Sequence, residues 1–259
     1  MTSFRRMNKV LLTDKIKTVG WIISAYIVVI LLSLLPDMFN GSFFSKQWSA
    51  VLMQHAMSWS WLATLLAFIF LTWISEKVYT SNRYRLIPVS DTKLYLSNIL
   101  SSLIAFILVS LVELIFVLIF YLFNMKQVST ILSSSFSGVE SRVWLLLLAL
   151  VLVSLAGILF WWAMISLIHL LTTAISRALP ANHQTLYKII IYIVLIYIAI
   201  WMFNKLQAWI SQLAYLQYMM YSSSVYTGPM WTALIMFVIA VVISAVNIWL
   251  LNKEVETKQ

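Results

Sequence analysis

Six long apolar runs alternate with shorter polar segments along the chain. They lie at approximately Val19–Leu35, Val51–Ile74, Leu96–Phe123, Val143–Leu171, Ile189–Phe203 and Trp231–Leu251. About 20 apolar residues are needed to cross the hydrocarbon core of a bilayer as a helix. The pattern therefore predicts an all-α integral membrane protein, in which residues 1–259 form a single domain of six transmembrane helices.

The segment before the first run is basic and has helical periodicity. Phe4, Met7 and Leu11 share one helical face. The other faces carry the basic residues Arg5, Arg6, Lys9 and Lys15. This pattern predicts a short N-terminal interfacial helix under the inner leaflet, with its basic side chains on the anionic headgroups of membrane lipid. A solvated basic start to the first span fits the same residues.

The run Ile189–Phe203 is short for a span, and the helical pattern continues beyond it. Between Asn204 and Gly228, apolar residues recur at helical spacing: Leu206, Trp209, Ile210, Leu213 and Leu216. We therefore expect the helix to continue past Lys205 and to be followed by an outer interfacial or re-entrant helix before the last span. Pro229 suits the first turn of that span.

Composition agrees with a membrane protein, and charge orients it. Only 10% of the residues are charged, whereas about 25% is typical of soluble domains. If the N-terminus is inside, 13 of the 17 Lys and Arg residues face the cytoplasm and four face outward. By the positive-inside rule, both termini are predicted to be cytoplasmic. This bias accounts for the net charge of +9, so no nucleic-acid partner is needed to explain it.

The sequence lacks the common signatures of catalysis and nucleotide binding. It contains no cysteine, which excludes disulfides, thiol catalysis and cysteine-based metal sites. It has no HExxH, GxSxG or GxxxxGK[ST] motif. We therefore expect this chain to have no enzyme activity and to hold no cofactor or metal of its own.

Four polar residues inside the predicted spans are candidates for function. Glu113 lies near the middle of the third span, where a carboxyl group either handles protons, cations or substrate, or fixes helix packing through hydrogen bonds. His169, near the inner end of the fourth span, lacks companions for a metal site because His55 is predicted on the far side. Asn98 and Asn247 are predicted to form interhelical hydrogen bonds.

The longest polar passage between two runs is the predicted cytoplasmic loop Glu76–Leu94. Pro88 should end any helix that enters from Arg83–Leu86, and Ser90 or Asp91 can cap the helix of the third span. The loop offers apolar anchors and oriented donors, the residue types that dominate protein contacts. Its candidate contact residues are Arg83, Tyr84, Arg85, Leu86, Ile87, Pro88, Ser90 and Asp91. A loop that only obeys the positive-inside rule would explain its lysines well but its apolar side chains less well.

Two short pieces of the chain resemble a known family. The stretch NRYRLIPVSDTKLYLSN, Asn82–Asn98, resembles the cytoplasmic loop of ABC exporter permeases of the type-2 family, in which an R-x-L-P-[VI]-S-like turn precedes the third span. The stretch NIWLLNKEVE, Asn247–Glu256, resembles the end of such permeases from Gram-positive bacteria. The six-span layout and the chain length agree with the family.

The resemblance implies a multi-pass permease subunit in a bacterial plasma membrane. A separately encoded ABC ATPase would bind ATP and Mg²⁺ and dock on the loop Glu76–Leu94. A second permease subunit, identical or related, would complete the substrate path. Aromatic-rich spans favour an amphipathic or hydrophobic cargo such as a peptide, lipid or drug. Two alternatives stay open: a stand-alone secondary transporter or channel that uses Glu113, and an immunity protein that sequesters a toxic peptide.

Overall fold

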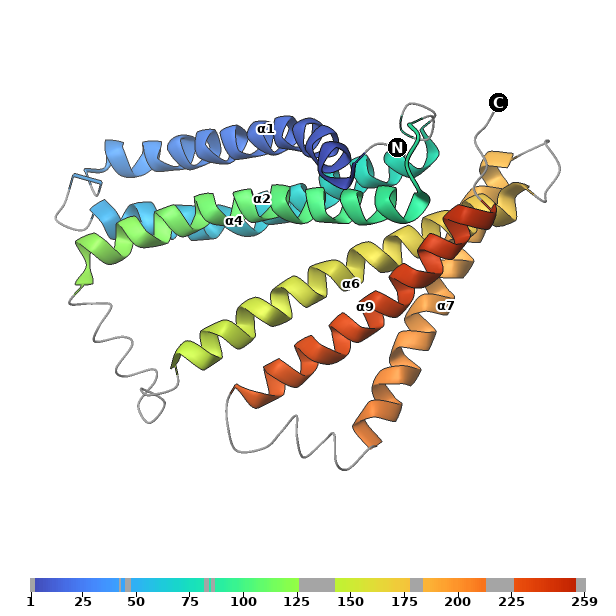
Figure 1. The fold of residues 1–259 in the computed structure, drawn as a ribbon. Helices are drawn as coiled ribbons and strands as arrows, with labels where there is room; N and C mark the ends of the chain where they lie inside the picture. Colours follow the sequence, from blue (N-terminus) through green and yellow to red (C-terminus); the bar gives the residue numbers. More distant parts are fainter. Residues whose placement is uncertain are drawn as a thin grey trace. The chain divides into compact units, whose positions relative to one another are not determined.

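The described part of the protein consists almost entirely of long helices (Figure 1). A computed structural model describes residues 3–41, 43–44, 48–81, 84, 87–125, 143–177, 184–212 and 226–254. The helices are α1 (Phe4–Phe39), α2 (Trp48–Thr80), α4 (Asp91–Phe123), α6 (Val143–Arg177), α7 (Gln184–Gln212) and α9 (Thr227–Glu254). All six are long and apolar enough to cross a membrane, and the described part of the chain contains no strand. The predicted all-α, six-span architecture is therefore confirmed.

Most of these helices are longer than the bilayer core requires. α2 and α4 each contain 33 residues, which at 1.5 Å per residue makes each about 50 Å long. The hydrocarbon core is only about 30 Å thick. α2 and α4 therefore extend beyond the hydrocarbon core, and the connection between them joins these extensions. We call the end of these helices at which α2 and α4 are joined the loop end.

The chain divides into two compact units. The first unit comprises Met1–Val78 and Leu96–Glu140, and therefore contains α1 and most of α2 and α4. The second comprises Tyr79–Tyr95 and Ser141–Gln259, and contains the α2–α4 connection with α6, α7 and α9. The boundary crosses α2 and α4 near the loop end, so the tips of these two helices belong to the second unit.

In the first unit, one continuous face of α1 is buried along nearly the whole helix. Its buried residues recur every three or four positions: Met7, Leu11, Lys15, Val19, Ile22, Tyr26, Ile30 and Leu34. The C-terminal half of this face packs on small residues of α2, including Ala56 and Ala63. The hydroxyl of Tyr26 donates a hydrogen bond of 2.9 Å to the carbonyl of Ala56. Small residues let two membrane helices approach closely, which explains why α1 and α2 pack here.

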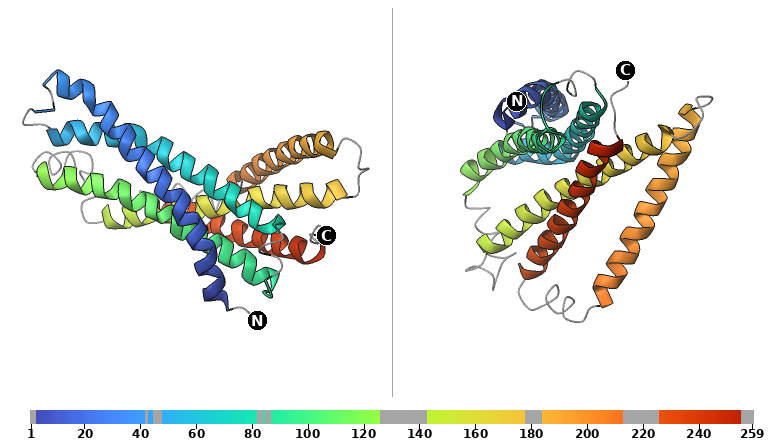
Figure 2. Two further views of the ribbon diagram at one scale, coloured as in Figure 1. Left: turned by 90° about the horizontal axis from the view of Figure 1, so that it is seen from above. Right: turned by 45° about the vertical axis from the view of Figure 1, so that its right-hand side comes forward.

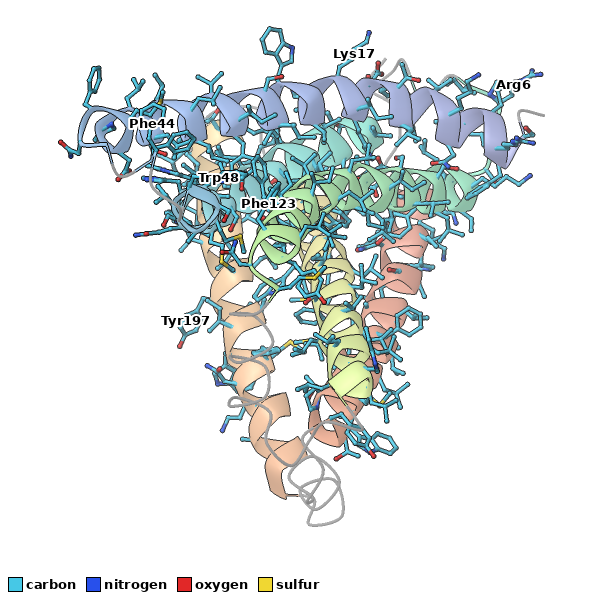
Figure 3. The ribbon with its side chains drawn as sticks, turned by 90° about the vertical axis from the view of Figure 1, so that its left-hand side faces the viewer. Arg6, Lys17, Phe44, Trp48, Phe123 and Tyr197 are labelled. Carbon is cyan, nitrogen blue, oxygen red and sulfur yellow. The ribbon has the colours of Figure 1, made fainter. Side chains whose placement is uncertain are left out.

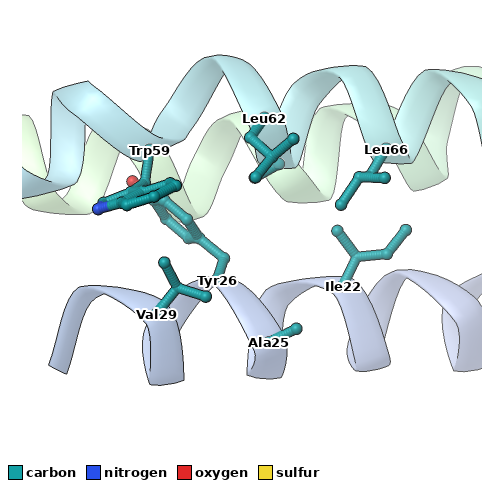
Figure 4. Close-up of a pocket in the computed structure, with 8 residues that line it drawn as sticks. Ile22, Ala25, Tyr26, Val29, Trp59, Leu62 and Leu66 are labelled. Carbon is teal, nitrogen blue, oxygen red and sulfur yellow. The ribbon is translucent and has the colours of Figure 1, made fainter. Parts of the chain in front are cut away.

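A small apolar cavity lies between α1 and α2 (Figure 4). It has a volume of about 50 Å³ and is lined by Ile22, Ala25, Tyr26, Val29, Trp59, Leu62, Ala63 and Leu66. Sites for drug-sized ligands occupy about 300–1,000 Å³. This cavity is therefore a packing gap rather than a substrate site.

In the second unit, α6 packs against both α9 and α7 (Figures 1 and 2). On α6 and α9, buried residues recur at intervals of seven: Ala149, Ala156, Ala163 and Leu170 on α6, and Ala233, Ala240 and Asn247 on α9. A seven-residue repeat keeps one stripe of each helix facing its neighbour, and small residues in the stripe allow close approach. By contrast, the apolar window of α7 over Thr185–Lys205 has no buried residue.

The N-terminal segment differs from the separate interfacial helix predicted from the sequence. α1 runs without interruption from Phe4 to Phe39, and Ser3 caps it by accepting a 3.3 Å hydrogen bond from the backbone N–H of Arg6. Met7 and Leu11 are each only 1% exposed, so they pack inside the protein rather than on lipid. The reason is that the buried face of the first span continues with the same spacing into the basic segment.

At the other end of the chain, α7 continues to Gln212, as the pattern past Lys205 predicts. The predicted outer interfacial or re-entrant helix falls on residues 213–225, which lie outside the described residues. α9 then begins at Thr227, and its first backbone hydrogen bond runs from the N–H of Met230 to the carbonyl of Tyr226. Pro229 therefore occupies the first turn, where its missing N–H would have no intrahelical partner.

Candidate functional site

The connection between α2 and α4 is described at Ser81, Tyr84 and residues 87–90, and it turns tightly at Pro88. α2 continues to Thr80 and α4 begins at Asp91, so the ends of the predicted loop Glu76–Leu94 are helical. Within the connection, the N–H of Ile87 bonds to the carbonyl of Tyr84 at 3.3 Å. The N–H of Val89 bonds to the carbonyl of Ile87 at 2.7 Å. This second bond closes an inverse γ-turn on Pro88, whose fixed φ suits the central position of such a turn.

The start of α4 agrees with the predicted capping. The N–H of Leu94 donates a 3.0 Å hydrogen bond to the carbonyl of Ser90, which places Ser90 at the N-cap. Asp91 follows in the first turn, where the positive end of the helix dipole favours an acidic side chain. Tyr84 and Ile87 are half-buried, and Pro88 is exposed. The predicted contact residues Arg83, Arg85 and Leu86 lie outside the described residues.

A buried cluster, here called the tyrosine–asparagine cluster, fastens both ends of this connection within the second unit. It consists of Tyr79 on α2, Tyr95 on α4, Ser244 and Asn247 on α9, and Ala163 on α6. The rings of Tyr79 and Tyr95 are stacked, with centroids 5.6 Å apart and planes 19° apart. Both tyrosines and Asn247 are 0% exposed.

Hydrogen bonds complete the tyrosine–asparagine cluster. Asn247 donates one N–H of its side-chain amide to the Tyr95 hydroxyl at 3.0 Å and the other to the Ala163 carbonyl at 2.9 Å. The Tyr95 hydroxyl donates to Oγ of Ser244 at 3.3 Å. Both N–H donors of the Asn247 amide are thus satisfied, and satisfied buried polar groups favour one packing arrangement. The two helix ends that flank the loop are therefore held against α6 and α9, and the interhelical role predicted for Asn247 is present.

A second buried polar cluster, here called the lysine cluster, was not expected from the sequence. Lys15 on α1 is 0% exposed, although it was predicted to face lipid headgroups. Its ammonium nitrogen lies 2.6 Å from the carbonyl oxygen of Asn98 and 2.7 Å from the Asn98 side-chain oxygen. It lies 2.8 Å from Oγ of Ser101 and 2.6 Å from Oγ of Ser102, both on α4. Asn98 therefore forms the interhelical bonds predicted for it, but with a partner that was not foreseen.

A signal for the lysine cluster was present in the sequence. Lys15 continues the spacing of Met7, Leu11 and Val19, so it lies on the buried face of α1. The positive-inside rule counts every lysine in the same way, so it does not reveal that Lys15 lies on the buried face of α1. On the opposite side of α1, Arg6 and Lys17 point away from α2 and α4 (Figure 3).

Glu113 contacts a neighbouring helix but remains partly exposed. The hydroxyl of Thr64 on α2 donates a 2.7 Å hydrogen bond to its carboxylate. This contact is what the packing role predicts, whereas the ion-coupling role stays a prediction. In the described part of the chain, no group of three or more His, Cys, Asp or Glu residues could hold a metal.

The two described histidines make separate contacts. Nδ1 of His169 lies 2.6 Å from the hydroxyl of Tyr192, which joins α6 to α7. Nε2 of His55 lies 2.7 Å from the carboxylate of Asp37, which joins α2 to the last turn of α1. Each contact serves helix packing, and the structure brings neither histidine to the α2–α4 connection or to Glu113.

The sequence was also compared with families and with known proteins. No family model matches it, and no curated protein or solved structure shows significant similarity to it.

Proposed function

We propose that this multi-pass membrane protein is the permease subunit of an ATP-driven exporter of the type-2 ABC family. In this proposal a separate ATPase subunit docks on the α2–α4 connection and binds ATP and Mg²⁺. The observation that carries the proposal is the tyrosine–asparagine cluster, because it holds both helix ends that flank the α2–α4 connection in one defined arrangement. A loop whose only role is to place basic residues at the membrane surface would not need a buried cluster that holds its two ends.

The lengths of α2 and α4 support the same mechanism. Each is a continuous helix of 33 residues. A displacement at the loop end would therefore be transmitted along both helices into the membrane. Closure of the ATPase on ATP would move the loop, and the two spans would follow. All chemistry of hydrolysis belongs to the partner, since this chain carries no nucleotide-binding motif.

The proposal includes a second permease subunit, identical or related, and a bacterial plasma membrane as the location. The exposed apolar window of α7 is available to lipid or to such a subunit. The cargo would be amphipathic or hydrophobic, such as a peptide, lipid or drug. Neither the 50 Å³ cavity between α1 and α2 nor the scarce polar groups within the spans favour a large hydrophilic substrate.

The direct test is purification of the tagged chain from its native membrane. We expect an ATPase with a P-loop to copurify in a fixed molar ratio, and the complex to hydrolyse ATP in a vanadate-sensitive manner. A tagged six-span protein of another family from the same membrane controls for non-specific capture. Purification of the intact chain without any ATPase would contradict the proposal and favour the alternatives.

The second candidate function is a stand-alone secondary transporter or channel, and the partial exposure of Glu113 within a span favours it. Glu113→Gln separates the two. The amide oxygen of glutamine can still accept the hydrogen bond from Thr64, so under the exporter proposal ATPase activity in proteoliposomes should stay within about twofold of wild type, equivalent to about 0.4 kcal/mol. Activity is measured with and without an imposed proton gradient. A loss whose size depends on that gradient would favour the secondary transporter.

A further inference from the structure

The lysine cluster joins three helices through one network of hydrogen bonds. An ammonium group has three donors and no acceptor, and all four oxygens around Lys15 belong to α4. Ser75 extends the network to α2, because its Oγ lies 2.7 Å from Oγ of Ser102. In addition, the side-chain amide of Asn98 donates a 3.0 Å hydrogen bond to the carbonyl of Ser75. α1, α2 and α4 are thus held together at one point.

The position of this point along the helices is informative. Lys15 precedes the predicted first span, which begins at Val19, by four residues, or about 6 Å of helix. Ser75 directly follows the predicted second span, and Asn98 lies in the first turn of the predicted third span. The network therefore lies at the loop end of the spans. Glu76, the next residue on α2, interacts electrostatically with Lys15 and adds attraction between α2 and α1.

An apolar side chain would fill the position of Lys15 at a lower desolvation cost, because its neighbours on the buried face are Met7, Leu11 and Val19. Burying a cation is favourable only if its geometry and hydrogen bonds are good. The advantage of a cation at this position is that it specifies the axial position of α1 relative to α4. If α1 slid along α4 by one turn, the ammonium would leave its oxygens and lie among apolar side chains. The lysine cluster therefore allows one register between α1 and α4.

We propose that Lys15 is a latch that makes α1 move as one body with α2 and α4 when the α2–α4 connection is displaced. The drive for that displacement rests on the function proposed above. The sequence pattern alone would leave α1 as an independent anchor. With the latch, an ATPase bound at the loop would act on three spans rather than two.

The first experiment tests the latch itself. The purified full chain in detergent is treated briefly with an acetylating reagent, and modification of each lysine is quantified by mass spectrometry. Lys15 should react at least tenfold more slowly than Lys9 and Lys17, which are exposed on the same helix. Ser102→Ala, which removes one acceptor and the link to Ser75, should raise the rate at Lys15 and leave the rate at Lys17 unchanged. Equal rates at Lys15 and Lys17 in the wild type, or no effect of Ser102→Ala, would overturn the latch.

The second experiment tests the transmission in the complex with its ATPase. Because the chain has no cysteine, Asn40→Cys places a single reporter directly after α1. ATP with vanadate should change its rate of reaction with a membrane-impermeant maleimide. Adding Lys15→Met should abolish that change while the ATPase still copurifies, and adding Lys17→Met, which removes the same charge from an exposed position, should not.

The outcomes distinguish the two proposals. If Lys15→Met leaves the ATP-dependent change intact, or if the parent shows no change, α1 does not follow the loop and the inference is overturned. If Lys15→Met fails to fold, Ser102→Ala replaces it in the same assay and should reduce the change. If no ATPase copurifies with the wild type, the proposed function fails and the transmission with it, whereas the acetylation rates still decide whether the latch exists.

Discussion

Replacing both Arg85 and Leu86 with alanine should release the ATPase from the membrane subunit while the chain still inserts. Under the proposed function, these residues supply a charge-assisted contact and an apolar anchor to a groove of the ATPase. Loss of such a contact typically costs on the order of 1–2 kcal/mol or more, and about 1.4 kcal/mol is tenfold in affinity. The ratio of ATPase to tagged chain after purification should therefore fall about tenfold or more, together with vanadate-sensitive hydrolysis.

Lys93→Ala is the matched control for this prediction. It also removes one positive charge from the region of the loop, but Lys93 is exposed on the first turns of α4 and is explained by the positive-inside rule alone. The control should keep its ATPase. A double variant that retains both the ATPase and its activity would show that the docking surface lies elsewhere, and the connection after α6 or the start of α1 would be tested next.

Tyr95→Ala should be the most destabilising single substitution at the loop end. It removes a buried ring that stacks on Tyr79 and takes away one of the two hydrogen-bond acceptors of the Asn247 amide. Replacing a buried aromatic residue with alanine typically costs about 3–5 kcal/mol. The free energy of unfolding in detergent should fall by about that amount, which can be measured by denaturant titration followed through tryptophan fluorescence.

Two further substitutions make this prediction specific. Tyr95→Phe keeps the ring but leaves buried polar groups without their partner, so it should cost about 1–3 kcal/mol. Tyr197→Ala removes the same side chain from α7, where it is 70% exposed, and should change stability by no more than about 0.5 kcal/mol. Equal losses for Tyr95→Ala and Tyr197→Ala would show that the tyrosine–asparagine cluster does not hold the ends of α2 and α4.

The sequence predicted local features of the loop end well. Ser90 or Asp91 was expected to cap the helix of the third span, and Ser90 occupies the N-cap of α4. Pro88 lies in an inverse γ-turn, whereas most of the segment Arg83–Leu86, whose helix it was expected to end, lies outside the described residues. The capping prediction succeeds because capping by the residue before a helix acts over a few neighbouring residues. The partners of the residues next to the loop were not predictable in the same way, since Tyr79, Tyr95 and Asn247 are far apart in sequence.

Lys15 shows most clearly where reasoning from composition stops. As a basic residue before a span, it was assigned to lipid headgroups, and charge counting cannot separate it from Lys17. Only packing decides which of the two is buried, because α4 places four oxygen acceptors opposite one of them. The same holds for Met7 and Leu11, whose apolar face is equally suited to lipid and to protein.

By itself, the sequence determined the class of the protein and the number and approximate limits of its spans, because crossing a bilayer requires a stretch of apolar residues whose length can be read along one dimension. The tertiary structure decided which face of each helix is buried and which polar groups meet. It continued α1 through the basic segment, enclosed Lys15, and brought Tyr79 and Tyr95 to Asn247. These outcomes depend on neighbouring helices, and side chains in a membrane protein seek hydrogen-bond partners from whichever helix lies beside them.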